Sequence, residues 1–139
     1  MRDRPSSRAK LTLNMMRSAD ERAQDDARIL TKAINRIASL WNLTDIELGQ
    51  MLATSAAMAA AFRTDIAHLG PDSPPLLAAR YLVRLFAGLD TALGSDNTAV
   101  LRWLHATNED LGARPIDILD SPSSLGALCD YVDGSHERS

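Results

Sequence analysis

The sequence predicts an all-α fold, and three observations lead to this prediction. Alanine and leucine supply most of an apolar content of 45%, and both residues favour helix over strand. β-Branched residues are scattered and never alternate with polar ones, as they do in a half-buried strand. Apolar residues instead recur at three- and four-residue steps, which places them on one face of a helix. We expect six or seven helices, arranged as a helix-turn-helix-like N-terminal part packed with a small helical C-terminal part.

Residues 1–18 are basic and are expected to form a flexible N-terminal tail. They contain one acidic side chain, that of Asp3, and five basic side chains, those of Arg2, Arg4, Arg8, Lys10 and Arg17. Short charged termini are usually untethered, and a basic one is also suited to contact phosphate. Both interpretations stay open at this point.

Residues 19–70 have the outline of a helix-turn-helix. The first helix is expected to end at Asn42 and to share one apolar face, made of Ala27, Leu30, Ile34, Ile37 and Trp41. Thr44 and Glu47 form a capping box that opens a short second helix. The buried face of this second helix is expected to comprise Leu48, Met51 and Leu52. Ser55 caps a third helix that runs to about Ala67, and two short helices with a tight polar break are typical of the motif.

Residues 71–139 form the C-terminal part. The proline-rich segment 70–75 marks the boundary, because proline begins helices but does not extend them. A loop from residue 108 to residue 114 contains Gly112, which suits a left-handed backbone conformation. The last helix begins at Ser121-Pro122, and Gly134 is expected to cap its C-terminal end. The apolar faces of these helices are expected to comprise Leu82, Leu85, Phe86, Leu89, Leu93, Val100, Trp103, Leu104, Leu125, Leu128, Cys129 and Val132.

The residue inventory does not favour an enzyme, and no catalytic residue, metal site or cofactor is expected. The three histidines lie far apart in the sequence, without a second ligand at zinc-site spacing. The single cysteine, Cys129, lies on an apolar helix face, as a core thiol does. The sequence contains no glycine-rich phosphate loop and no nucleophile-elbow serine.

DNA binding has mixed support. In the third helix only Ser55, Arg63 and Thr64 offer polar contacts to bases or phosphates, because alanine fills most other positions. A formal net charge of −3 also differs from the basic excess of most nucleic-acid binders. An ordinary helical hairpin and a degenerate DNA reader both fit this pattern.

A run of residues in the C-terminal part carries a more specific signal. Trp103-Leu104-His105 is followed by Asn108, Leu111-Gly112, Arg114-Pro115-Ile116-Asp117-Ile118-Leu119, Leu125 and Tyr131-Val132. This order and spacing resemble the Xre/MbcA/ParS antitoxin family. Its C-terminal domain has a tryptophan-leucine start, an asparagine, a glycine-x-x-proline-hydrophobic-aspartate-hydrophobic-leucine run and a closing amphipathic helix. The resemblance extends upstream to Trp41, Leu43 and the helix-turn-helix and covers residues 40–133.

The resemblance implies that the chain is the antitoxin of a type II toxin–antitoxin pair. Antitoxins of this family neutralise RES-domain toxins, which consume NAD or transfer its ADP-ribose to a target. The C-terminal domain covers the toxin's active-site cleft, the antitoxin is a homodimer, and some members repress their own promoter DNA. The toxin-binding residues implied for this chain are Arg114, Leu125, Leu128, Tyr131, Val132, His136, Glu137 and Arg138.

Arg114 also stands out without the resemblance. It lies in a loop before Pro115 and has no obvious partner four residues away. A contact with another protein, or a charge-assisted bond to a carboxylate, is the expected use of its guanidinium group.

Two other functions remain open from the residues alone: a helix-turn-helix transcription regulator that needs no toxin, and a helical adaptor module. We expect a cytoplasmic protein. The chain has no apolar stretch long enough to span a membrane, it lacks the apolar core of a secretion signal, and one cysteine cannot form an internal disulfide.

Overall fold

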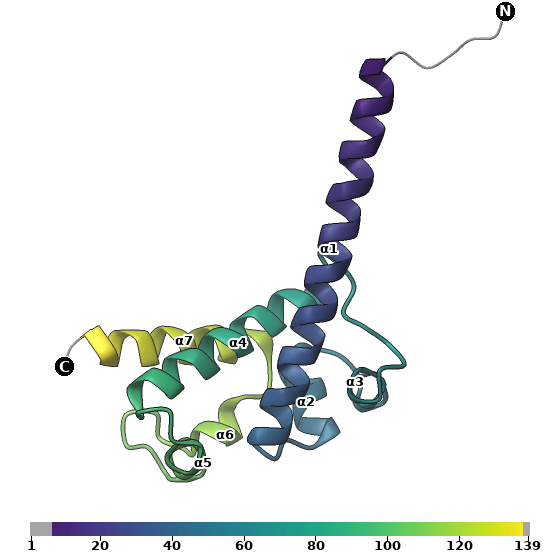
Figure 1. The fold of residues 1–139 in the computed structure, drawn as a ribbon. Helices are drawn as coiled ribbons and strands as arrows, with labels where there is room; N and C mark the ends of the chain where they lie inside the picture. The colour runs from purple at the N-terminus through teal and green to yellow at the C-terminus, as the bar shows by residue number, and fades with distance from the viewer. Residues whose placement is uncertain (1–6, 138–139) are drawn as a thin grey trace, which may run out of the picture.

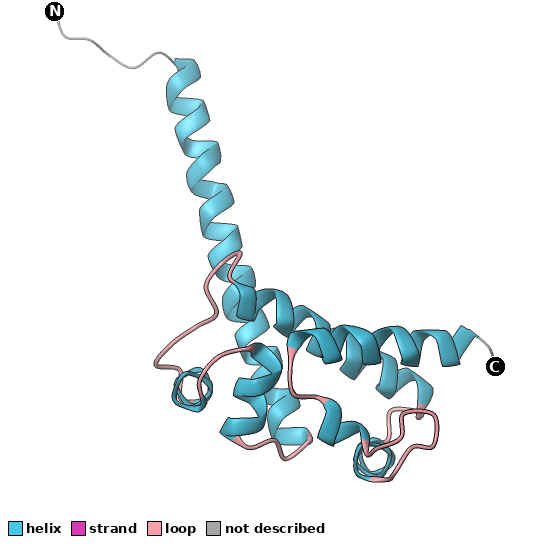
Figure 2. Ribbon diagram, turned by 180° about the vertical axis from the view of Figure 1, so that it is seen from behind, coloured by secondary structure: helices cyan, strands magenta, loops and turns pink. Residues whose placement is uncertain are grey.

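The computed structural model describes residues 7–137, apart from the side chains of residues 135–137. Over this part of the chain all named elements are helices and no strand forms, which confirms the all-α prediction (Figures 1 and 2). The helices are α1 (Ser7–Leu40), α2 (Asp45–Leu52), α3 (Ala56–Arg63), α4 (Pro74–Ala92), α5 (Asn97–His105), α6 (Pro115–Ile118) and α7 (Pro122–Glu137). None of these helices is long and apolar enough to cross a membrane.

Helix α1 begins well before the predicted first helix. The expected flexible tail over residues 1–18 is wrong for residues 7–18, which form the first turns of α1, while residues 1–6 lie outside the described part of the chain. Extending an existing helix fixes one residue for each new hydrogen bond, which costs far less than nucleating a helix. The N-terminal half of α1 extends away from the rest of the molecule, and Ala27 is its first buried residue (Figure 1).

One hydrophobic core joins the predicted N-terminal and C-terminal parts. Helix α4 lies at its centre and packs against α1, α2 and α7. The largest apolar side chains that are fully buried are those of Trp41, Ile34, Leu48, Met51, Leu52, Leu82, Leu85, Leu104, Leu125 and Leu128. The proline-rich segment before α4 therefore connects two parts of the chain that share one core.

The α2–α3 hairpin forms as the sequence predicts. The Thr44 hydroxyl accepts a hydrogen bond from the Glu47 amide, and the Glu47 carboxylate accepts one from the Thr44 amide, so the capping box is complete. The Ser55 hydroxyl caps α3 by accepting a hydrogen bond from the Met58 amide, and α3 ends at Arg63, before the predicted end at Ala67. The turn after α2 packs closely against Gly49 of that helix. A Cβ atom at Gly49 would lie 2.8 Å from the Thr54 carbonyl oxygen.

Helices α4 and α7 lie side by side and run in the same direction (Figure 1). Near their middle, the Cys129 thiol donates a hydrogen bond to the Tyr81 carbonyl oxygen. Further along, the Arg84 guanidinium on α4 binds the Asp133 carboxylate on α7. Helix α7 then continues through Gly134 to Glu137, so the prediction that Gly134 caps its C-terminal end is wrong.

Candidate functional site

The loop that connects α5 to α6 is held in one conformation by its own hydrogen bonds. The Asn108 side-chain oxygen accepts from the amides of Asp110 and Leu111, at 2.9 and 3.3 Å. The main chain of Asn108 pairs with Ala113 on one side and accepts from the amide of Gly112 on the other. Gly112 has a φ of 72°, which confirms its predicted left-handed conformation. This loop is an ordered surface feature of the molecule.

Arg114, at the end of this loop, forms a two-point ion pair with Asp117. The Arg114 Nε and Nη2 atoms donate to the two carboxylate oxygens of Asp117 at 2.8 and 2.9 Å. Of the two uses expected for Arg114, a charge-assisted bond to a carboxylate is present, and the carboxylate belongs to a residue of the same chain three positions away. Both side chains are exposed, and the hydrogen bond from Arg114 lowers the pKa of the Asp117 carboxyl below its ordinary value. The pair therefore presents an oriented positive and negative charge to solvent.

The hydrophobic part of the predicted toxin-binding surface lies inside the molecule. Leu125, Leu128 and Val132 are all buried. On the α4 side, a Cβ atom at Gly88 would lie only 3.2 Å from the Val132 Cγ1 atom. In this structure α7 uses its apolar face to complete its own core, and the contact of these three side chains with a toxin stays a prediction.

Tyr131 remains available at the surface. Its side chain is half-buried, and its hydroxyl donates a hydrogen bond to the Asp110 carboxylate at 2.9 Å. This bond connects α7 to the loop between α5 and α6, and therefore to the neighbourhood of Arg114. We define the polar ridge as Asp110, Arg114, Asp117 and Tyr131.

The remaining predicted contact residues are at the C-terminal end of the chain. His136 and Glu137 belong to the last turn of α7, and Arg138 lies outside the described residues. Gly134, which precedes them, has open space around the position that a Cβ atom would occupy. The last turn of α7 therefore extends past the core.

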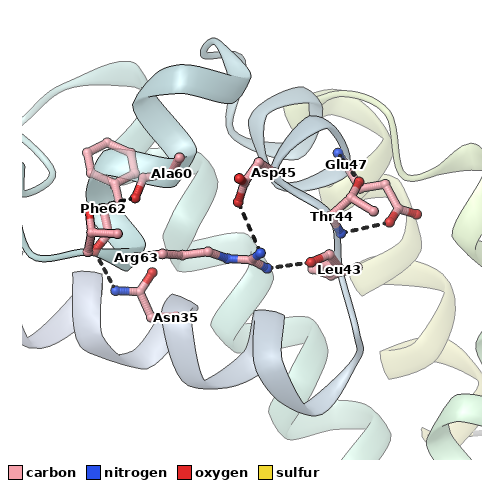
Figure 3. A network of polar contacts seen from close by, with 9 residues as sticks. Asn35, Leu43, Thr44, Asp45, Glu47, Ala60, Phe62 and Arg63 are labelled. Atoms are coloured by element: carbon pink, nitrogen blue, oxygen red, sulfur yellow. Dashed lines mark hydrogen bonds and ion pairs between the residues drawn. The ribbon is translucent and has the colours of Figure 1, made fainter.

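The three predicted DNA contacts are already engaged within the chain. Ser55 caps α3, and the Thr64 hydroxyl donates to the Ala60 carbonyl oxygen. Arg63 donates to the Asp45 carboxylate at 3.0 Å and to the Leu43 carbonyl oxygen, which fixes α3 against the start of α2 (Figure 3). All three side chains therefore stabilise the fold through contacts within the chain, and the Asp45 carboxylate neutralises the Arg63 charge.

Asn35 completes this network from α1. Its amide nitrogen donates to the Phe62 carbonyl oxygen at 2.8 Å, so α1 holds the end of α3 in place (Figure 3). The Asn35 Oδ1 and Arg63 Nε atoms are buried without a hydrogen-bond partner among the described residues, and both residues line one open depression. The network orients α3 and leaves few donors on its outer face.

Neither a thiol nucleophile nor a metal centre is built in the described part of the chain. Burial raises the pKa of the Cys129 thiol to about 11, so the nucleophilic thiolate is scarce at neutral pH. Among the described side chains, those of residues 7–134, no group of three or more His, Cys, Asp or Glu residues is arranged to hold a metal ion.

Sequence reasoning missed two members of the polar ridge. Asp117 lies three residues after Arg114, a spacing that is visible in the sequence and that permits an ion pair on one helical turn. Asp110 and Tyr131 are 21 residues apart, and no local pattern connects them.

The chain matches no protein-family model and no curated protein. The motif residues and their places in the fold are therefore the features that bear on function.

Proposed function

We propose that this chain is the antitoxin of a type II toxin–antitoxin system, and that it binds a RES-domain toxin and blocks its NAD-binding active site. The proposal rests on the resemblance to the Xre/MbcA/ParS family. Most apolar residues of that resemblance serve the core, Leu104 and Leu119 among them. The exposed polar residues of the matching run, such as Arg114 and Asp117, are therefore the ones available to bind a partner.

The observation that favours protein binding most is the preformed polar ridge. Arg114 is exposed and already oriented by Asp117, so little side-chain entropy is lost when it meets an acidic or carbonyl partner. Arginine and tyrosine are enriched among the residues that dominate protein interfaces. A steric inhibitor needs such a fixed surface and needs no reacting group, which agrees with the raised pKa of Cys129.

The test is to purify the tagged full-length chain from its native host and to identify the protein that accompanies it. The partner is then assayed for NAD consumption with and without this chain. NAD loss that appears only after the chain is removed supports the proposal. A partner that leaves NAD intact, or binding of promoter DNA by the unaided chain, favours the adaptor or the regulator instead.

Variants then locate the contact. Arg114→Ala is expected to weaken the complex by about tenfold or more, as removal of a central interface arginine commonly does. Arg102→Ala is the matched control, because Arg102 is exposed on the neighbouring helix α5 but lies outside the polar ridge. Deletion of residues 134–139 is expected to weaken neutralisation more than it weakens folding, because Gly134 lies at the edge of the core.

A further inference from the structure

A groove of about 390 Å³ lies between α1 and α4, which meet at an angle (Figure 1). Its α1 side includes Ala23, Leu30 and Ala33, which follow one another at seven- and three-residue steps and therefore share one face of that helix. Its α4 side includes Leu76 and Val83, which are seven residues apart and also share one face. Both sides of the groove are therefore mainly apolar, and the α1 side extends over about 15 Å of helix.

The chain leaves this apolar surface open to solvent. Ile29, which also lines the groove, is 66% exposed, and Leu30, Ala33 and Val83 are only half-buried. The groove also lies where the support of α1 ends, because residues 7–22 are all exposed. A helix of that length is only marginally stable in water without packing. An occupant of the groove would therefore bury apolar surface and would support α1 where this helix leaves the body of the molecule (Figure 1).

Three charged side chains line the same groove. Asp26 belongs to α1, Asp72 to the loop before α4, and Arg80 to α4, and all three are exposed. None of them has a side-chain hydrogen bond or an ion pair within the described part of the chain. The two carboxylates favour a cationic group on the occupant, and the guanidinium group favours an acceptor oxygen at another point. The occupant that fits is therefore apolar where it faces the two helices and carries at least one basic group.

We propose that this groove binds an amphipathic helix from a partner protein, and that a lysine or arginine at the edge of its apolar face meets Asp26 and Asp72. Helices that bind in grooves commonly use apolar anchors at positions i, i+4 and i+7. Three such anchors span about 10 Å, which fits within the length of the α1 side. The two carboxylates then select basic helices over acidic ones. None of the groove residues belongs to the polar ridge, so this surface does not depend on the proposed binding of a toxin.

The first test uses the full-length protein and two synthetic peptides, each about four helical turns long. Both peptides carry leucine at positions i, i+4 and i+7, and the flanking positions are lysine in one and glutamate in the other. The NMR signals of the Ile29, Leu30 and Val83 methyl groups report on the groove. The lysine peptide is expected to shift these signals and to bind at least about tenfold more tightly, because the two carboxylates attract it and repel the glutamate peptide.

Two results overturn the proposal at this stage: no shift at these methyl groups, or equal affinity of the two peptides. Hexylammonium is the third probe. If it binds as tightly as the lysine peptide, the groove is a site for a small amphipathic cation, and the helix is refuted.

The second test removes the two carboxylates. Asp26→Asn/Asp72→Asn is expected to weaken binding of the lysine peptide by about tenfold, about threefold for each exposed charge. Asparagine suits the second site, because Asp72 has a φ of 59° and asparagine tolerates this left-handed conformation. Asp20→Asn/Asp120→Asn removes the same charge outside the groove and is expected to bind as the wild type does, while circular dichroism shows that both double variants are folded. Equal affinity of the groove variant and the wild type, or an equal loss in both double variants, overturns the proposal.

Discussion

Replacement of Leu125 by alanine distinguishes a core residue from a contact residue. The Leu125 side chain is 0% exposed, so the change removes three buried carbon atoms. At about 0.8 kcal/mol for each buried methylene this loss is about 2.4 kcal/mol, and the cavity left behind adds to it. We expect the free energy of unfolding to fall by about 3 kcal/mol, within the range of 2–5 kcal/mol typical of buried Leu→Ala changes.

The assay is urea unfolding followed by circular dichroism, in which the midpoint shifts and the slope m stays constant. Leu77→Ala is the matched control, since Leu77 lies on α4 but is 52% exposed. Its loss is expected to stay below about 1 kcal/mol, as for most surface substitutions. Equal, small losses for both variants would refute the reasoning, because Leu125 would then not be packed as the structure places it.

Three further predictions concern single sites. Gly49→Ala is expected to destabilise the fold by about 1–3 kcal/mol, because its Cβ would lie 2.8 Å from a backbone oxygen. Gly134→Ala is expected to stabilise the fold by up to about 1 kcal/mol, because a Cβ there meets open space. Urea unfolding curves measure both changes. NMR titration is expected to give Asp117 a pKa below its ordinary value, and Arg114→Ala is expected to return that pKa towards the ordinary value. The stability that the pair contributes is lost as the pH falls through the lowered pKa. Cys129 is expected to resist a thiol reagent at pH 8 in the native state and to react fully in denaturant, because burial raises its pKa to about 11.

Local signals predicted most of the helix boundaries. The capping box at Thr44 and the cap at Ser55 depend on residues three positions apart, so the sequence alone contains the whole interaction. The start of α1 was missed for a physical reason. Its first turns are rich in basic side chains, which are typical of a solvated tail, but they also carry the apolar period of the helix that follows.

The candidate site was less predictable than the fold. An apolar stripe on α7 has the same period whether it faces its own core or a partner, so Leu125 and Val132 could not be assigned from spacing. Only the packing of α7 against α4 decides between the two. The hydrogen bond between Tyr131 and Asp110 depends on tertiary structure in the same way, because their separation of 21 residues leaves no periodic signal.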